Sequence, residues 1–202
     1  MGALLALASY AGGACGSDST AEDDELEAQV CQQADLGELF VEQASATFRP
    51  ADLADVAPDA DERLPALREA GLIRGHFVFW KEAIGRPPFE SPVNVVCQAL
   101  EFRSSEQAEA FAAGLRATPR DLASAALTWL PEGERTAIEG ANYREGVRVF
   151  GLTAEDDATS IEVTVVVAGA GRYVRSIYAG GQSGPVAAAD VLAVLERIRT
   201  RQ

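Results

Sequence analysis

Apolar positions repeat at helical spacing in three stretches of the chain, and each stretch predicts a helix. Residues 59–71 (DADERLPALREAG) place three apolar side chains on one face and end at Gly71, where a C-cap glycine is favoured. Residues 104–117 (SSEQAEAFAAGLRA) begin with a Ser-x-x-Gln capping box. The last stretch, residues 184–201, opens with Gly-Pro and has four positions that face inward: Val191, Leu192, Leu195 and Ile198.

Other stretches follow the pattern of strands. Residues 73–84 (IRGHFVFWKEAI) have bulky side chains on both faces, which predicts a strand away from the sheet edge. A proline-rich loop separates them from a hairpin partner at residues 93–102 (VNVVCQALEF). Residues 36–48 are expected to form a helical turn and a strand. Three later strands are predicted, the last two joined by a glycine-rich turn at 169–171: GVRVFGL (146–152), TSIEVTVVVA (159–168) and RYVRSIYA (172–179).

The order of these elements predicts the fold class. Each half of the chain has strands followed by a helix, which indicates an α+β fold with an antiparallel sheet. We expect the helices to pack mainly on one face, and two diverged strand-strand-helix halves are an alternative description. A chain of 202 residues, 48% of them hydrophobic, can bury a core, so residues 30–202 are expected to form a single domain.

The net charge argues against nucleic acid as a partner, and its distribution along the chain indicates an acidic tether near the N-terminus. The chain has 17 basic and 31 acidic side chains, a net charge of −14, which would repel nucleic acid. Residues 16–69 carry 15 acidic and 3 basic side chains, a net of −12, so the acidity belongs mostly to the front of the chain. Residues 15–29 are interpreted as a solvated acidic tether, with ordered structure beginning near Val30.

The first residues fit an export signal better than a membrane span. Residues 1–14 are too short to cross roughly 30 Å of hydrocarbon. A myristoylation signal is excluded because position 6 is Ala6 rather than Ser or Thr. An apolar core followed by Gly12, Gly13 and Ala14 is typical of the end of a signal peptide.

The end of this stretch, from Gly12 to Cys15, resembles the lipobox of bacterial lipoproteins, in which a cysteine after small residues receives a diacylglyceryl group. The resemblance implies lipid attachment at Cys15, a membrane partner bound through that lipid, and a place in the cell envelope, on the outer face of the cytoplasmic membrane or secreted. Two alternatives stay open: Cys15 is an ordinary residue of a disordered tail, or cleavage occurs nearby without lipidation.

The cysteine count agrees with an extracytoplasmic location. Three cysteines leave one over, and if Cys15 carries lipid, Cys31 and Cys97 remain as a disulfide pair. Their bond would close a loop of about 67 residues, worth roughly 4 kcal/mol in the chain-entropy model. The alternative is two buried free thiols, while a zinc site is disfavoured because no C-x-x-C is present and His76 is the only histidine.

Catalytic and metal motifs are weak throughout the chain. His76 lies inside a predicted strand, where a hydrogen-bonded structural role is favoured over that of a base. The stretch GGQSGP has Pro185 where a nucleophile elbow needs glycine, and is expected to be a loop before the last helix. Two acidic groups, Asp59, Asp61, Glu62 and Glu155, Asp156, Asp157, lack the pattern of a calcium loop. No catalytic residue, metal or cofactor is assigned.

Aromatic residues offer a further candidate site. Five aromatic residues could line an apolar ligand pocket between sheet and helices: Phe77, Phe79, Trp80, Phe89 and Trp129. The favoured alternative is that such aromatic residues pack in the core.

Three longer segments, REAGLIRGHFVFW, VVCQALEFRSSEQAEAFAAGL and AGRYVRSIYAGG, carry a wider likeness. Their order resembles small secreted or lipid-anchored α+β domains of actinobacteria, including ones with a PsbP-like sandwich. The likeness spans residues 36–200 and implies a fold, with no catalytic residue carried over.

Together these features predict a lipid-anchored extracytoplasmic module that binds a small apolar ligand or a protein partner. The alternative is an envelope enzyme whose site is assembled from scattered residues, and the sequence favours the non-enzymatic hypothesis.

Overall fold

The chain folds around an antiparallel sheet that separates two hydrophobic cores. The computed structural model describes residues 21–83, 93–124, 127, 130, 134–138, 142–144, 146–155, 157, 159–181 and 184–201. The strands are β1 (Phe40–Phe48), β2 (Leu72–Glu82), β3 (Asn94–Phe102), β4 (Glu134–Ile138), β5 (Asn142–Arg144), β6 (Val147–Glu155), β7 (Ser160–Ala170), β8 (Tyr173–Gly181) and β9 (Gly184–Pro185). The helices are α1 (Ala21–Glu27), α2 (Gln33–Leu36), α3 (Pro50–Asp55), α4 (Ala60–Glu69), α5 (Ser105–Gly114) and α6 (Ala188–Arg201).

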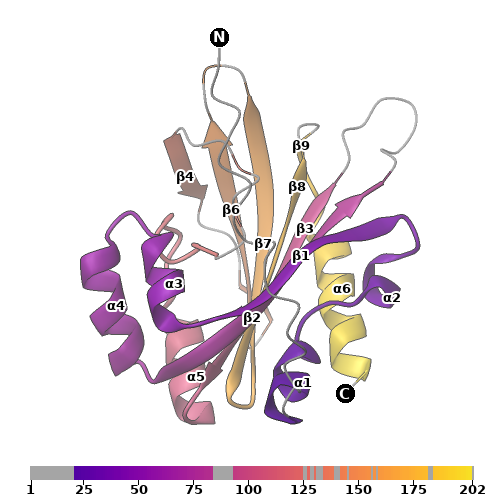
Figure 1. The fold of residues 1–202 in the computed structure, drawn as a ribbon. Coiled ribbons are helices and arrows are strands. Elements are labelled where there is room, and N and C mark those ends of the chain that lie inside the picture. The colour runs from indigo at the N-terminus through magenta and orange to yellow at the C-terminus, as the bar shows by residue number, and fades with distance from the viewer. Residues whose placement is uncertain are drawn as a thin grey trace, which may run out of the picture.

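The sheet has the strand order β1-β2-β3-β8-β7-β6-β4, with β5 added to β6 and β9 to β8 (Figure 1). All the pairings are antiparallel, including the predicted hairpin of β2 with β3 and the central pair of β3 with β8. The predicted α+β class with an antiparallel sheet is therefore confirmed, and β2 lies inside the sheet as its two bulky faces indicated.

Helices cover both faces of the sheet, so the prediction that they pack mainly on one face is wrong. Strand β3 sends Val96 and Leu100 into a core with α3, α4 and α5, and Val95 and Cys97 into a second core with α1 and α6. Strand β8 alternates in the same way. Because these central strands are apolar on both faces, each face needs a helical layer to exclude water.

The positions of α5 and α6 test the idea that the two strand-strand-helix halves of the chain are a diverged duplication. Helix α5 follows the β2–β3 hairpin and α6 follows the β7–β8 hairpin. Because β3 and β8 are antiparallel neighbours, a twofold axis that related the two units would run perpendicular to the sheet and place both helices on one face. Helices α5 and α6 contribute to opposite cores, so the arrangement does not support a simple repeat.

One helix boundary has the chemistry that the sequence predicted, one has it in part, and one does not. Gly71 follows α4 with φ +86°, a conformation that glycine adopts without strain. The Ser104 hydroxyl accepts a hydrogen bond from the Gln107 N–H at 3.2 Å at the start of α5, but the Gln107 side-chain oxygen has no partner among the described residues, so only one half of the capping box forms. The last helix begins at Ala188 rather than at Gly184, because residues 184–185 pair with β8 as strand β9. Within the described ranges, no helix is long and apolar enough to cross a membrane.

The proposed tether ends earlier than its predicted boundary at residue 29. Helix α1 spans Ala21–Glu27, and Leu26 and Val30 are buried in the second core. Leu26 docks this acidic helix, while Asp24, Glu25 and Glu27 stay exposed. Residues 1–20, which contain the predicted signal remnant and Cys15, lie outside the described residues.

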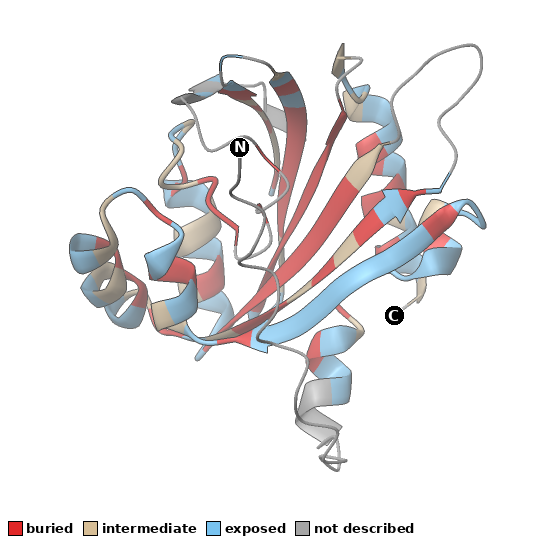
Figure 2. Ribbon diagram, turned by 45° about the horizontal axis from the view of Figure 1, so that its top comes forward, coloured by how far each residue is buried: buried red, intermediate tan, exposed pale blue. Residues whose placement is uncertain are grey.

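Strand β1 forms an exposed edge of the sheet. Residues 41–47 are all exposed, and among the described strands β1 pairs only with β2 (Figure 2). A register shift between Glu42 and Ala44 leaves Gln43 as an extra residue in the strand. Such a bulge, together with a charge at the edge, disfavours pairing with a foreign strand.

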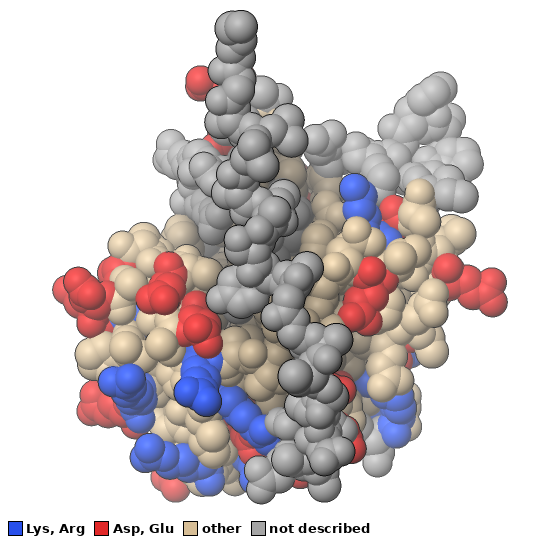
Figure 3. Space-filling view, viewed as in Figure 1, with Lys and Arg blue, Asp and Glu red and all other residues tan. Residues whose placement is uncertain are grey.

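Charge is mixed on the surface around the first core. On the face shown in Figure 3, acidic and basic side chains lie among one another rather than in one large acidic patch. Arg120 pairs with Asp59 at 3.0 Å, for example. The large negative net charge therefore coexists with local ion pairing in the folded body.

The disulfide predicted between Cys31 and Cys97 is present. The two Cα atoms are 5.7 Å apart, and 66 positions separate the cysteines along the chain. Cys97 lies on β3, inside the sheet, so the bond fastens the segment after α1 to the middle of the second core.

Replacing both cysteines, Cys31→Ala with Cys97→Ala, should lower the free energy of unfolding by roughly 4 kcal/mol, because the unfolded chain regains the freedom that the closed loop removes. Urea unfolding followed by circular dichroism measures this loss. Unfolding of the parent protein with and without reductant is the control, since reduction should reproduce most of the same shift. A midpoint equal to that of the parent protein would contradict the role of the bond.

Candidate functional site

A hollow of about 380 Å³ lies between α6 and one end of the sheet. We call it the apolar hollow. Its walls come from α2, from the starts of β1 and β3, from the ends of β8 and β9, and from α6. The larger apolar side chains that line it are Leu36, Phe40, Val93, Val95, Ile177, Pro185, Val186, Val191 and Val194.

The hollow exists because small residues leave space that the walls do not fill. Where α6 approaches the sheet, the lining positions include Ala179, Gly181, Gly184, Ala187 and Ala193. Farther along the helix, Leu195 and Ile198 are each only 1% exposed in the second core. Helix α6 is therefore tightly packed along its second half and stands over a cavity along its first half.

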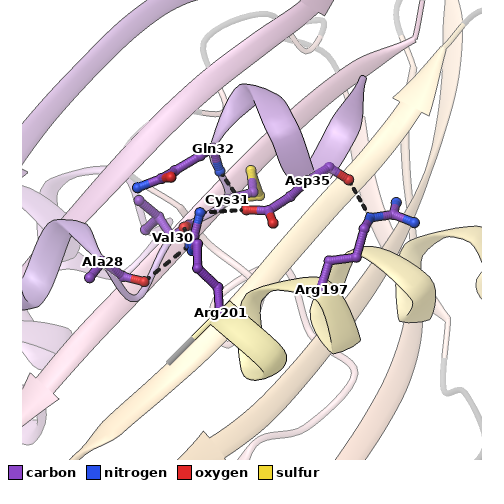
Figure 4. The surroundings of a disulfide bond; sticks show 8 residues. Ala28, Val30, Cys31, Gln32, Asp35, Arg197 and Arg201 are labelled. Atoms are coloured by element: carbon purple, nitrogen blue, oxygen red, sulfur yellow. Dashed lines mark hydrogen bonds and ion pairs between the residues drawn. A yellow bond between two sulfur atoms is a disulfide. The ribbon is translucent and has the colours of Figure 1, made fainter. Parts of the chain in front are cut away.

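Two charged side chains of opposite sign line the apolar hollow. Asp190 and Arg197 both belong to α6 and are exposed, and their spacing of seven residues places them two turns apart on one side of the helix. The Arg197 Nε donates a hydrogen bond to the main-chain oxygen of Asp35 at 2.6 Å (Figure 4). This bond holds the Arg197 side chain against the α2 segment at the edge of the hollow.

The wall formed by α2 is held from several directions. The Cys31–Cys97 disulfide fastens its start, and the Asp35 carboxylate accepts a bond from Arg201 Nη1 at 2.7 Å (Figure 4). Arg201 also donates to the main-chain oxygens of Ala28 and Val30 at 3.2 and 2.7 Å. Arg197 and Arg201 thus bind specific groups of the α2 segment. Their position near the end of α6 also gives them a favourable interaction with the dipole of that helix.

His76 is a buried residue of β2, as its position in the sequence predicted. Its Nδ1 lies 3.1 Å from the Thr47 hydroxyl of the neighbouring strand, and the residue is 6% exposed. It does not line the apolar hollow. The arrangement supports the interpretation of His76 as a hydrogen-bonded structural residue.

The acidic groups singled out in the sequence are engaged separately. Asp59 pairs with Arg120, and the Glu155 carboxylate accepts a bond from the Ser160 hydroxyl at 3.0 Å. Asp156 lies outside the described residues. Among the residues that the structure describes, no group of three or more His, Cys, Asp or Glu side chains is placed to hold a metal ion.

Three of the five aromatic residues pack in the cores, as the favoured alternative predicted. Phe77 and Phe79 pack against the first core and Trp80 is buried in the second, while Phe89 and Trp129 lie outside the described residues. The hollow instead uses Phe40 and the small residues around GGQSGP, whose outer members Gly181, Gly184 and Pro185 line it. The run of small residues was visible in the sequence, but only the packing of α6 over it reveals a cavity.

A second polar cluster lies inside the first core. Arg63 Nη1 and Asp121 Oδ1 are 3.5 Å apart, and the Ser124 hydroxyl donates to the Gln98 side-chain oxygen at 2.9 Å. Burial lowers the pKa of Arg63, with the Asp121 charge opposing this, and burial raises the pKa of Tyr178 to about 12. The cavity beside them is only about 10 Å³, space for about one water molecule. This cluster is a buried polar network rather than a ligand site.

Comparison with known proteins supports the fold and assigns no residue. No protein-family model matches the chain, and no curated protein matches it. Among solved structures, the extracellular domain of PknH from Mycobacterium tuberculosis is similar, with a TM-score of 0.54 and 12% identity over 88% of this chain and 96% of that chain. At the level of the fold this agrees with the expected likeness to actinobacterial domains, while the lipobox and the PsbP-like sandwich stay predictions.

Asp35→Ala should lower the free energy of unfolding by about 2–3 kcal/mol, because it removes the partner of Arg201 and the acceptor of the Gln32 N–H. Asp52→Ala is the matched control: Asp52 accepts the Arg49 N–H at 2.7 Å in the same position of α3 but is exposed. Its loss should be about 1 kcal/mol. If both variants lose the same free energy of unfolding in urea, the Asp35–Arg201 ion pair adds nothing to the stability of the α2 wall.

Proposed function

We propose that this protein is an extracytoplasmic binding module that holds a small, largely apolar molecule in the apolar hollow. The observation that carries the proposal is the hollow itself: about 380 Å³ of space under α6, lined mainly by aliphatic side chains. Ligand sites have volumes of about 300–1,000 Å³ and a few polar groups among apolar walls. A cavity of this kind leaves apolar surface in contact with water unless a ligand covers it.

The location outside the cytoplasm is supported by the disulfide and by the fold. Cys31 and Cys97 are bonded, and such bonds persist in oxidising compartments while cytosolic thiols are kept reduced. The similar fold of the PknH extracellular domain agrees with this location. The sequence contributes the export signal predicted over residues 1–14.

The charged side chains suggest the chemistry of the ligand. Arg197 and Asp190 stand at the rim, whereas the interior surface comes from side chains such as Val95 and Ile177. A molecule with an apolar body and one polar or acidic end would bury the body and leave the end near Arg197. An envelope enzyme, the alternative, would have to build its chemistry on these same two charges, because the buried His76 does not reach the hollow.

Ala193→Phe should weaken binding of a neutral apolar dye, N-phenyl-1-naphthylamine, by at least about tenfold, because the added ring fills the space that the dye needs. Ala193 is exposed on α6 and lines the hollow, so the substitution does not disturb the core. Fluorescence titration of the full chain measures the dissociation constant. Ala113→Phe, at an exposed position on α5 across the sheet, is the control and should bind as the parent does.

Saturable binding lost only in Ala193→Phe supports the proposal. Absence of saturable binding in the parent protein, or equal weakening by both substitutions, would refute a ligand site in this hollow.

We also propose that Cys15 carries a lipid that tethers the module to the membrane. The support is the sequence around Gly12, Gly13, Ala14 and Cys15, together with the pairing of the other two cysteines in the structure. With Cys31 and Cys97 bonded, Cys15 is the cysteine left for another role.

Cells that express the full chain and are fed an alkyne-labelled fatty acid should incorporate label, and Cys15→Ala should abolish it. Cys31→Ala with Cys97→Ala is the control variant and should keep the label, because those cysteines are bonded to each other. Label that persists in Cys15→Ala, or parent protein that retains Met1, would rule out this modification.

A further inference from the structure

The segment between Cys31 and Phe40 lies along one side of the apolar hollow and is fixed at both ends. Cys31 is bonded to Cys97 on β3, and Phe40 begins strand β1. Between these two points the chain forms α2 and the turn that follows it. We call residues 32–39 the α2 loop. Among the described residues that line the hollow, the α2 loop contributes Leu36.

The α2 loop fully buries no apolar side chain of its own. Leu36 is half-buried, and Asp35, whose side chain is 6% exposed, is the one buried residue. The other six residues are exposed: Gln32, Gln33, Ala34, Gly37, Glu38 and Leu39. Segments that bury little apolar surface open at a lower free-energy cost than the core around them. The position of the loop therefore depends on its polar bonds more than on the hydrophobic effect.

Among the described residues, the hydrogen bonds between the α2 loop and α6 are made by Asp35 (Figure 4). Arg201 Nη1 donates to the Asp35 carboxylate at 2.7 Å, and Arg197 Nε donates to the Asp35 main-chain oxygen at 2.6 Å. Charged donors make strong hydrogen bonds, but water can satisfy the same groups when they separate. One residue thus holds the loop against α6 through bonds that can be broken without exposing a core.

The two ends of the α2 loop are suited to act as hinges. At the far end, the Leu39 main-chain oxygen accepts the Ala83 N–H at 2.8 Å, which holds that end to the segment after β2. Gly37, two positions earlier, has φ +120°, and a Cβ added there would meet no atom within 4 Å. Glycine reaches such conformations without steric cost, so the chain can turn at this point. At the near end, the disulfide of Cys31 keeps the loop beside the hollow.

We propose that the α2 loop is a lid on the apolar hollow, latched shut by the bonds of Asp35 to Arg197 and Arg201. When these bonds break, the loop swings about its two hinges and Leu36 withdraws from the hollow, which lets a ligand enter or leave. When they form again, Leu36 covers the apolar body of the bound molecule. This inference rests on the ligand function proposed above for the hollow, and it adds the step that sets the rates of binding and release.

Arg201→Gln tests the latch, because Arg201 binds the Asp35 carboxylate and does not line the hollow. The full chain with Cys15→Ala, which removes the proposed attachment point for lipid, is mixed with N-phenyl-1-naphthylamine in a stopped-flow fluorimeter. Arg201→Gln should raise the association and the dissociation rate constants together, each by about tenfold, as expected for the loss of a charged hydrogen bond. The dissociation constant should change by less than about twofold, since the latch is lost equally from the free and the bound protein.

A second variant reaches the same latch from the other side. Asp35→Asn keeps the shape of the side chain and removes its charge, so it should also raise both rate constants. Arg199→Gln is the matched control: it removes the same charge from the same helix, but Arg199 contacts Glu196 of α6 at 3.5 Å rather than the α2 loop. Its rate constants should stay within about twofold of those of the parent, as expected for an exposed ion pair.

Hydrogen exchange gives a readout of opening that needs no ligand. The Gly37 N–H donates to the Gln33 main-chain oxygen at 2.8 Å, and a helix as short as α2 does not keep such a bond once it leaves α6. Exchange at Gly37 should therefore be faster in Arg201→Gln than in the parent, and unchanged in Arg199→Gln.

A parallel rise of both rate constants in Arg201→Gln and Asp35→Asn, with Arg199→Gln unchanged, supports the lid. Saturable dye binding with unchanged rate constants in the two latch variants would overturn the lid and leave the ligand site standing. A rise in dissociation alone, with weaker binding, would also overturn it, because a distorted wall rather than a lid gives that result. Absence of dye binding in the parent would refute the ligand site and the lid together.

Discussion

The disulfide between Cys31 and Cys97 is the constraint on which one whole face of the molecule depends. Cys97 lies on β3, which pairs with β2 and β8, so the bond anchors the front segment to an internal strand of the sheet. Helix α1 has few apolar residues of its own, and its docking relies on Leu26 and on this covalent tie. The apolar hollow takes part of its walls from this segment, through Leu36 and Phe40. A covalent bond suits this task because a short acidic helix buries too little apolar area to hold its position alone.

The arginines of α6 connect the C-terminus to that same segment. Arg201 binds the Asp35 carboxylate and two main-chain oxygens, and Arg197 binds the main-chain oxygen of Asp35. Main-chain carbonyls that follow α1 thus accept hydrogen bonds from charged side chains of a helix more than 160 positions away in sequence. Arg199, between them in sequence, contacts Glu196 of the same helix at 3.5 Å. One amphipathic helix therefore closes the second core, fixes the α2 wall and lines the apolar hollow.

The two ends of α6 meet different parts of the sheet. Near Ala188 the helix lies over small residues at the end of β8, which leaves an apolar cavity. Near Arg201 it binds the Asp35 carboxylate and the main-chain oxygens of Ala28 and Val30, so the same helix packs loosely at its start and is fixed by polar bonds at its end.

The sequence by itself predicted strands β1, β2, β3, β6, β7 and β8, the three longer helices, the α+β class and the cysteine pair, because hydrophobic period and cysteine count are local or countable properties. It also favoured a structural role for His76, which β2 buries beside Thr47. It did not predict β4, β5 or β9, which are short. Tertiary structure alone decided that both faces of the sheet are covered, that α1 docks, and where the apolar hollow lies. The glycines and alanines of GGQSGP and the following segment look like a loop in the sequence, and become a cavity only when α6 lies across them. Arg175 looks like one residue of a strand in the sequence, and only the tertiary structure places Gln29, from a segment 146 positions away, against its guanidinium. Cavities and electrostatic potentials are properties of groups brought together by packing, so no local pattern in the sequence encodes them.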